Sequence, residues 1–220
     1  SSVLDALAVS LGTFFSGIDG ISSLGISKND VFYKRYKMGS TDDIQRQYPV
    51  CIYAEGSIKQ QKISWERSLN SETGKTLFSN AKDMTLYAEK LQDKVRQGDV
   101  KTLLPIFAYY GAGRLWMQKK EKKASTELKN FTRFSGYIDC LDSASNEKMM
   151  LKWFEKMTLL ELQKQAEVPE LKVVKKAVIH CFKNAMEVNE ADVSFDIASH
   201  SLELKYRDCN GDWYKHPFND

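Results

Sequence analysis

Apolar residues at helical spacing occupy the first fifteen positions of the chain. Leu4, Leu7, Leu11 and Phe14 recur every three or four residues, the pattern of an amphipathic helix with one buried face. A loop rich in glycine and serine follows this helix. Two interpretations of its start stay open: Ser2 caps an ordinary N-terminal helix, or the chain continues from a longer protein.

A β-hairpin and a second helix are expected next. Residues 48–55 and 61–67 are rich in β-branched and aromatic residues and flank a short connection that contains glycine. They predict a hairpin over 48–67. The apolar residues of 76–97 recur at helical spacing, and Gly98 is a suitable stop, so this segment predicts a helix.

Residues 103–110 form a continuous apolar run, LLPIFAYY, which ends at Gly111. A run without polar alternation is typical of a strand that is buried on both faces of a parallel or mixed sheet. It therefore predicts an inner strand. Pro105 argues mildly against this, because proline has no N–H to donate to a neighbouring strand.

The last third of the chain changes from helical periodicity to a period of two. Apolar stripes predict two helices, which begin near Asn146 and Pro169, within a helical lobe over 135–190. Residues 191–220 alternate between apolar and polar positions, and Asn210-Gly211 is a strong hairpin-turn signal. This segment predicts a β-hairpin.

Composition and charge narrow the class of protein only slightly. The 220 residues suit one domain, or one domain with a lobe, and the hydrophobic fraction of 42% is ordinary for a globular protein. The formal net charge of +3 neither favours nor excludes nucleic acid. Helical and strand-like segments alternate, which predicts a mixed α/β fold.

Targeting signals and metal motifs are not evident. The apolar runs are far shorter than a bilayer span, and the first residues lack the basic region of a signal peptide, so no membrane is expected. The four cysteines are far apart, form no C-x-x-C and combine with the histidines in no zinc spacing. They predict reduced thiols and a cytoplasmic location.

Gly74-Lys75-Thr76 resembles the end of a phosphate-binding loop. A P-loop has the form G-x-x-x-x-G-K-[ST], and its first glycine would fall at position 69, which is Leu69. Glu72 also places a carboxylate where the phosphate would lie. We expect a helix N-terminus with a lysine in the preceding turn rather than a P-loop here.

Two basic segments are candidates for nucleic-acid contact. Residues 31–37 interleave lysine and arginine with aromatic residues, and residues 117–129 are rich in lysine. Short basic runs are more often solvated surface than nucleic-acid sites. The two segments nevertheless support an alternative function, a non-catalytic α+β domain that binds protein or nucleic acid.

Four segments together resemble bacterial SMC/RecF-type AAA ATPases of the ABC superfamily, and in particular predicted ATP-binding proteins involved in virulence and related phage-defence ATPases. They span most of the chain in the expected order. These segments are SVLDALAVSLG, ISWERSLNSETGKT, LLPIFAYYGAGRLW and RFSGYIDCLDSASNEKMMLKWFEKM.

The resemblance implies a partial ABC/SMC-type nucleotide-binding domain with an antiparallel β-subdomain and a helical lobe. Residues 1–134 would form the nucleotide-binding lobe, 135–190 the helical lobe, and 191–220 a hairpin that leads towards the signature motif. In this family the P-loop lies immediately before the position of Ser1, and the signature motif and Walker B strand come later. The chain is therefore expected to be a middle fragment, inactive alone.

The resemblance also carries candidate site residues. Ser1 would be the P-loop hydroxyl that binds magnesium. Arg67 is a weaker candidate, directed towards the base or ribose, and surface packing is the expected alternative. The residues assigned to nucleotide binding are Ser1, Ser2, Tyr110, Gly111, Gly113 and Arg114, and no catalytic residue is assigned.

The expected cofactors are ATP and magnesium, and the expected activity of the full-length protein is ATP hydrolysis. The expected partners are a second copy, through ATP-bound heads, and a nuclease or other effector protein. Nucleic acid is a further possible partner, in a process related to DNA or to defence.

Overall fold

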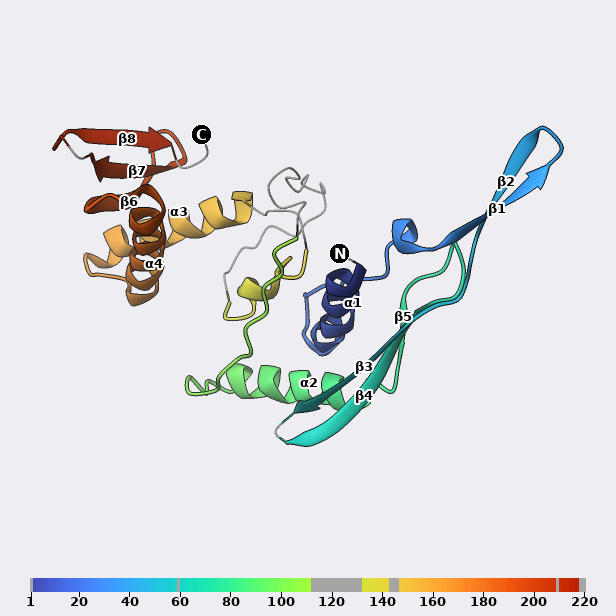
Figure 1. Ribbon diagram of the computed structural model, residues 1–220. Coiled ribbons are helices and arrows are strands. Elements are labelled where there is room, and N and C mark those ends of the chain that lie inside the picture. Colours follow the sequence, from blue (N-terminus) through green and yellow to red (C-terminus); the bar gives the residue numbers. More distant parts are fainter. Residues whose placement is uncertain (1, 59, 112–131, 143–146, 209, 218–220) are drawn as a thin grey trace. The chain divides into compact units, whose positions relative to one another are not determined.

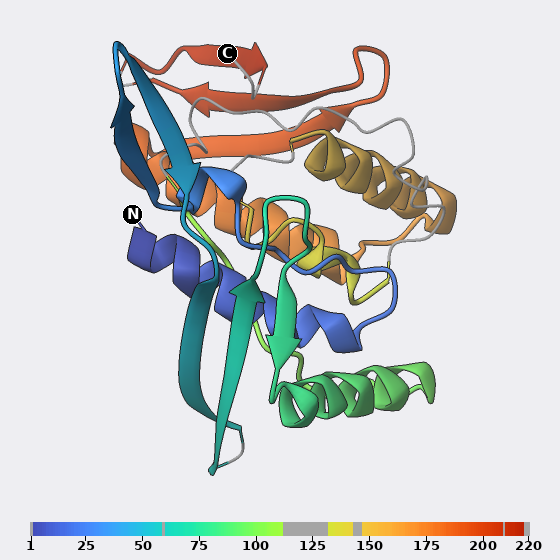
Figure 2. The same cartoon turned by 90° about the vertical axis from the view of Figure 1, so that its right-hand side faces the viewer.

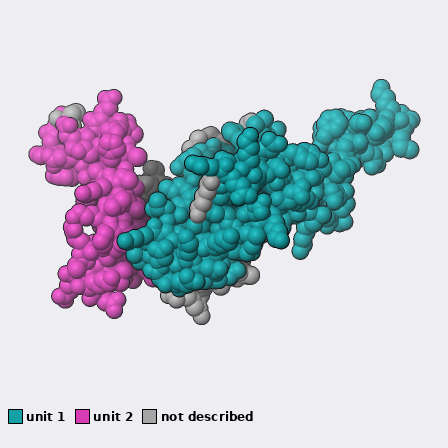
Figure 3. Space-filling model, turned by 90° about the horizontal axis from the view of Figure 1, so that it is seen from below, with its two compact units in different colours: residues 1–145 teal, residues 146–220 magenta. Residues whose placement is uncertain are grey.

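The chain forms two compact units, residues 1–145 and 146–220, which Figure 3 shows in different colours. The computed structural model describes residues 2–58, 60–111, 132–142, 147–208 and 210–217. Each unit combines helices with antiparallel strands, so the predicted mixed α/β fold is confirmed. The units differ from the predicted three-part division, because the helical lobe and the C-terminal strands share one core.

Unit 1 contains two long helices, three short 3-10 helices and two separate sheets among its described residues. The helices are α1 (Ser2–Leu11), η1 (Gly12–Gly17), η2 (Lys28–Asp30), α2 (Lys82–Arg96) and η4 (Ser135–Tyr137). One sheet is the hairpin of β1 (Tyr33–Met38) and β2 (Thr41–Arg46), and the other has the order β3 (Val50–Ile58), β4 (Gln61–Leu69), β5 (Leu77–Ser79).

The core of unit 1 lies between α1, η1, α2 and the β3–β4–β5 sheet (Figures 1 and 2). Phe14 and Phe15 of η1 are almost fully buried, and both pack against the ring of Tyr137. Trp65 of β4 donates a hydrogen bond from Nε1 to the carbonyl oxygen of Ser10, at 3.0 Å. The sheet therefore holds α1 through both apolar burial and a hydrogen bond.

The predicted hairpin over 48–67 is confirmed as β3 and β4, which pair in register from Val50–Leu69 to Ile58–Gln61. The predicted helix over 76–97 begins later, at Lys82, because residues 77–79 form β5 and pair with β4. Gly74-Lys75-Thr76 therefore leads into a strand and not into a helix, which contradicts the P-loop alternative.

The predicted inner strand over 103–110 is wrong, since this segment forms no strand within the described chain. Leu103 and Ile106 are 88% and 93% exposed, whereas Leu104 and Phe107 pack against the core. The carbonyl oxygen of Pro105 accepts a hydrogen bond from the Tyr137 hydroxyl at 2.7 Å. Pro105 has no N–H, and the apolar run is covered by described residues on one side only.

Unit 2 packs two helices against a three-stranded antiparallel sheet. The elements are α3 (Glu147–Lys164), α4 (Pro169–Met186), β6 (Glu190–Asp196), β7 (Ser201–Arg207) and β8 (Trp213–Pro217). Phe154 and Leu171 of the helices are buried against Val193 and Leu202 of the sheet. The hairpin of β7 and β8 confirms the turn that Asn210-Gly211 predicts.

Helices that could cross a membrane are not found in the described part of the chain, since none is both long and apolar enough.

Candidate functional site

The N-terminal turn of α1 lies beside the end of the 103–111 segment. The Tyr109 hydroxyl donates a hydrogen bond to Oδ1 of Asp5 at 2.6 Å. The Tyr109 N–H donates to the carbonyl oxygen of Cys140 at 2.9 Å, which fixes the segment on its other side. Tyr110 and Gly111 directly follow Tyr109, so this hydrogen bond joins their segment to the first turn of α1.

The same hydrogen bond shifts the pKa values of Asp5 and Tyr109. The Tyr109 hydroxyl holds the pKa of the Asp5 carboxyl below its ordinary value, and Asp5 in turn raises the pKa of Tyr109. Asp5 therefore stays ionised near neutral pH. A carboxylate in the first turn also interacts favourably with the positive end of the helix dipole.

The predicted site residues fall partly within the described chain. Ser2 begins α1 and is exposed, Tyr110 is 74% exposed, and Gly111 is half-buried. Ser1, Gly113 and Arg114 lie outside the described residues. A hydrogen bond from Tyr109 to Asp5 joins the segment that holds Tyr110 and Gly111 to the helix that begins with Ser2, although the two are more than a hundred positions apart in sequence.

Arg67 of β4 is buried and does not pack on the surface, since only 2% of the residue is exposed. Its Nη1 donates hydrogen bonds to the carbonyl oxygen of Val9 at 3.0 Å and to the hydroxyl oxygens of Thr13 and Ser23 at 3.3 and 2.9 Å. Its Nη2 donates to the carbonyl oxygen of Leu24 at 3.0 Å. Arg67 therefore joins α1, η1 and the following loop to the sheet.

All four acceptors of Arg67 are neutral oxygens, and no carboxylate pairs with the guanidinium in the described chain. Burial lowers its pKa from the ordinary value of an arginine. A buried cation with neutral acceptors is costly, and it is retained where its hydrogen bonds hold several segments together. The hydrogen bonds of Arg67 therefore support α1 and the segments that follow it.

A cluster of three or more His, Cys, Asp or Glu side chains able to hold a metal ion is not found among the described residues. A magnesium ligand set is therefore not formed by these residues alone. The resemblance assigns the magnesium-binding hydroxyl to Ser1, which is not described.

Comparison with protein families gives the class of this protein. The family model described as the AAA domain matches residues 1–182, which include all of unit 1 and much of the two helices of unit 2. The chain therefore belongs to the AAA domain family, among the SMC/RecF-like ATPases, and is a nucleotide-binding protein of the ATPase type. A search of curated proteins gives no match.

Sequence reasoning missed the Tyr109–Asp5 hydrogen bond and the buried position of Arg67. Neither has a short sequence signal, because the partners are 104 and 58 residues apart. The nearest signal was the alternation of the strand. An arginine at a position where the alternate residues are apolar is a candidate for burial, provided that hydrogen-bond acceptors surround it.

Proposed function

We propose that the chain forms part of an ATP-binding head and that, in the full-length protein, two heads bind ATP and magnesium between them and hydrolyse the ATP. The observation that carries this proposal is the Tyr109–Asp5 hydrogen bond, which joins α1 to the Tyr110–Gly111 segment. Membership of the AAA domain family supports ATP as the nucleotide that is bound.

The backbone N–H groups at the N-terminus of α1 support a bound phosphate group, whereas the ionised Asp5 in the same turn opposes it. Ser2 lies in the first turn, where backbone N–H groups without intrahelical partners favour an anion. Arg67 and Trp65 hold the other end of the same helix, so the N–H groups keep a fixed position. Preorganised donors of this kind stabilise charge without reorganising during a reaction.

Magnesium-bound ATP supplies the phosphoanhydride bond that is hydrolysed, and its reaction depends on positioning and charge neutralisation. Within this chain, Ser1 would hold magnesium and Ser2 would lie against the phosphates. Tyr110, Gly111, Gly113 and Arg114 would line the other side. We further propose a nuclease or other effector as the protein that uses the ATP cycle, in a cytoplasmic process related to DNA or to defence.

The test is ATP turnover by the full-length protein with Ser1→Ala, compared with Ser57→Ala on the exposed face of β3 as the control. We expect Ser1→Ala to reduce magnesium-dependent turnover by at least tenfold, because magnesium loses a ligand, and Ser57→Ala to leave it unchanged. Equal turnover in both variants, or no ATP binding by the full-length protein, would contradict the proposal.

A second candidate function is supported by the β1–β2 hairpin, which extends from the rest of unit 1 (Figure 1). Residues of both strands are exposed, apart from the half-buried Asp43. Lys34, Arg35 and Lys37 form no ion pair with any described residue, and Arg35 lies over the ring of Tyr33 at 5.8 Å. Unpaired cations beside exposed aromatic rings suit nucleic acid.

Binding of labelled duplex DNA by the full-length protein tests this candidate. The variant Arg35→Glu with Lys37→Glu should weaken binding strongly and reduce the slope of log affinity against log salt by about 2. The charge-matched control is Lys82→Glu with Lys90→Glu on α2. If both double variants weaken binding equally, the hairpin is not the contact surface.

A further inference from the structure

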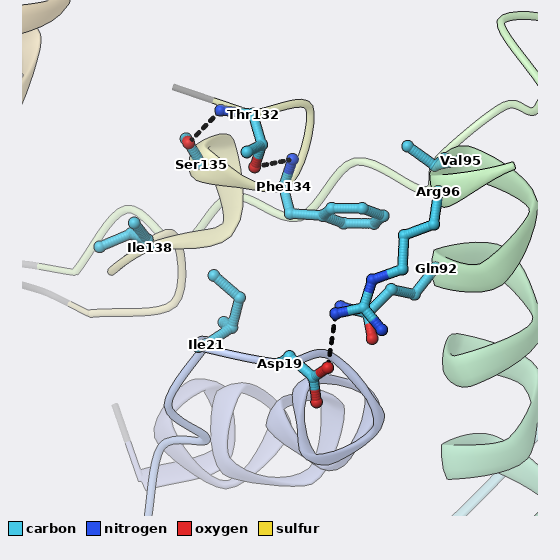
Figure 4. A pocket seen from close by; sticks show the side chains of 10 residues that line it. Asp19, Ile21, Gln92, Val95, Arg96, Thr132, Phe134, Ser135 and Ile138 are labelled. Carbon is cyan, nitrogen blue, oxygen red and sulfur yellow. Dashed lines mark hydrogen bonds and ion pairs between the residues drawn. The ribbon is translucent and has the colours of Figure 1, made fainter. Parts of the chain in front are cut away.

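A pocket of about 400 Å³ opens in unit 1 between α2 and two loop segments. The last two turns of α2 supply Gln92, Val95 and Arg96. The turn at 19–21 and the segment 132–138 close the other sides (Figure 4). This volume is within the range of small-molecule sites. No residue of the α1 N-terminal turn or of 109–111 lines the pocket, so it is separate from the proposed ATP site.

The walls of the pocket are mainly apolar. Ile21, Val95 and Ile138 are aliphatic, and Phe134 presents an aromatic ring that is itself largely buried (Figure 4). Apolar walls that include an aromatic ring favour a planar ligand ring, because ring faces bury a large area and stack with an aromatic neighbour.

The charges at the pocket cancel. Nη2 of Arg96 lies 2.5 Å from Oδ2 of Asp19, and both residues line the pocket. The guanidinium is therefore already neutralised and does not offer a free cation to a phosphate group. A neutral ligand fits this lining better than a nucleotide with its phosphates.

Gln92 is the polar group that sets the chemistry of the pocket. It is only 6% exposed, yet its side-chain amide forms no hydrogen bond with any residue of the described chain. The amide atoms of Gln92 are also not among the fully buried side-chain atoms that lack a hydrogen-bond partner, so a molecule in the pocket can reach them. The amide of Gln92 lies on the pocket wall, so a ligand there would satisfy it.

We infer that this pocket binds the base of an uncharged nucleoside. A glutamine amide has a donor and an acceptor side by side, and it pairs bidentately with the adjacent acceptor and donor of adenine. The ring of Phe134 would stack on the base, and the aliphatic side chains would cover its edges. The site is distinct from the ATP site proposed above and does not depend on it.

The test is titration of the 220-residue chain with adenosine, followed by methyl and amide NMR. We expect saturable shifts at Ile21, Val95 and Ile138. The variant Gln92→Leu should weaken adenosine binding at least tenfold. It should leave the melting temperature unchanged or raise it, because the amide has no protein partner to lose. The matched control is Gln97→Leu, an exposed glutamine just past α2, which should bind as the unchanged protein does.

Three results would overturn the inference. The first is the absence of saturable shifts at the three aliphatic residues in the unchanged protein, a measurement that does not depend on any variant folding. The second is equal affinity in Gln92→Leu, which would make the pocket a general apolar cavity. The third is a set of shifts confined to Tyr109–Gly111, which would place adenosine at the proposed ATP site instead.

Discussion

At the scale of single residues, Arg67 contributes most to the position of α1. Its guanidinium donates to oxygens of Val9, Thr13, Ser23 and Leu24, which belong to three consecutive segments of the chain. Each hydrogen bond from a charged donor contributes more than a neutral one, and each acceptor would be left buried without its partner. One side chain therefore acts on several elements at once.

Arg67→Ala should lower the free energy of unfolding by about 3 kcal/mol or more, because it removes several buried hydrogen bonds and creates a cavity. Urea denaturation measures this change. The control is Arg46→Ala, which breaks an exposed ion pair with Glu72 and should cost less than about 1 kcal/mol. Equal losses in the two variants would show that the burial of Arg67 is not stabilising.

At the scale of elements, η1 and α2 approach closely at Gly17. A Cβ at Gly17 would clash with the carbonyl oxygen of Thr85 and would lie 2.9 Å from the Cβ of Ala88. The two helices can pack at this separation only because the position is glycine. Helix packing here is therefore set by the lack of a side chain rather than by interlocking side chains.

Gly17→Ala should lower the melting temperature of unit 1 and cost about 1 to 3 kcal/mol, since the added methyl group forces η1 and α2 apart. Thermal unfolding by circular dichroism measures the effect. Gly136→Ala is the control, because nothing lies within 4 Å of a Cβ built at that glycine. If Gly17→Ala has the same melting temperature as Gly136→Ala, the two helices are not in tight contact.

The elements that could be predicted from sequence are those set by local pattern. Alternation and turn residues place β3 with β4 and β7 with β8, because both pairs are joined by short turns. The start of α2 and the state of 103–110 could not be predicted. Residues 77–79 become a strand only through pairing with β4. In the apolar run, some side chains pack against the core and others are exposed, and tertiary contacts decide which.

The candidate site follows the same rule. Resemblance identifies Ser2, Tyr110 and Gly111, but sequence pattern alone cannot show how their segments are joined. The hydrogen bond that joins these segments lies between Asp5 and Tyr109, which are 104 residues apart. Long-range contacts of this kind come from the packed core, and no window of local sequence contains both partners.

At the scale of the whole molecule, each of the two units has a core of its own. Unit 2 buries Phe154, Leu171, Val193 and Leu202 almost completely, and all of them belong to residues 146–220. A separate core is what allows a domain to unfold independently. The units should therefore respond separately to substitutions in either core.

Phe154→Ala should destabilise unit 2 by about 3 to 5 kcal/mol and leave unit 1 folded, because it opens a cavity in one core only. Residue-resolved hydrogen exchange of the full chain measures this difference. Leu159→Ala is the control on the same helix, since Leu159 is 46% exposed. Loss of protection in both units at once would show that they unfold as one.

The contacts of Arg67 and Trp65 also determine when α1 can reach its folded state during synthesis of the protein. Helix α1 is translated before β4, and its hydrogen bonds to Trp65 and Arg67 reach across 55 and 58 residues. At typical translation rates, the ribosome takes about 3 to 12 seconds to add that length of chain. During that interval α1 lacks its hydrogen bonds from Trp65 and Arg67, so chaperones can bind it as part of the nascent chain.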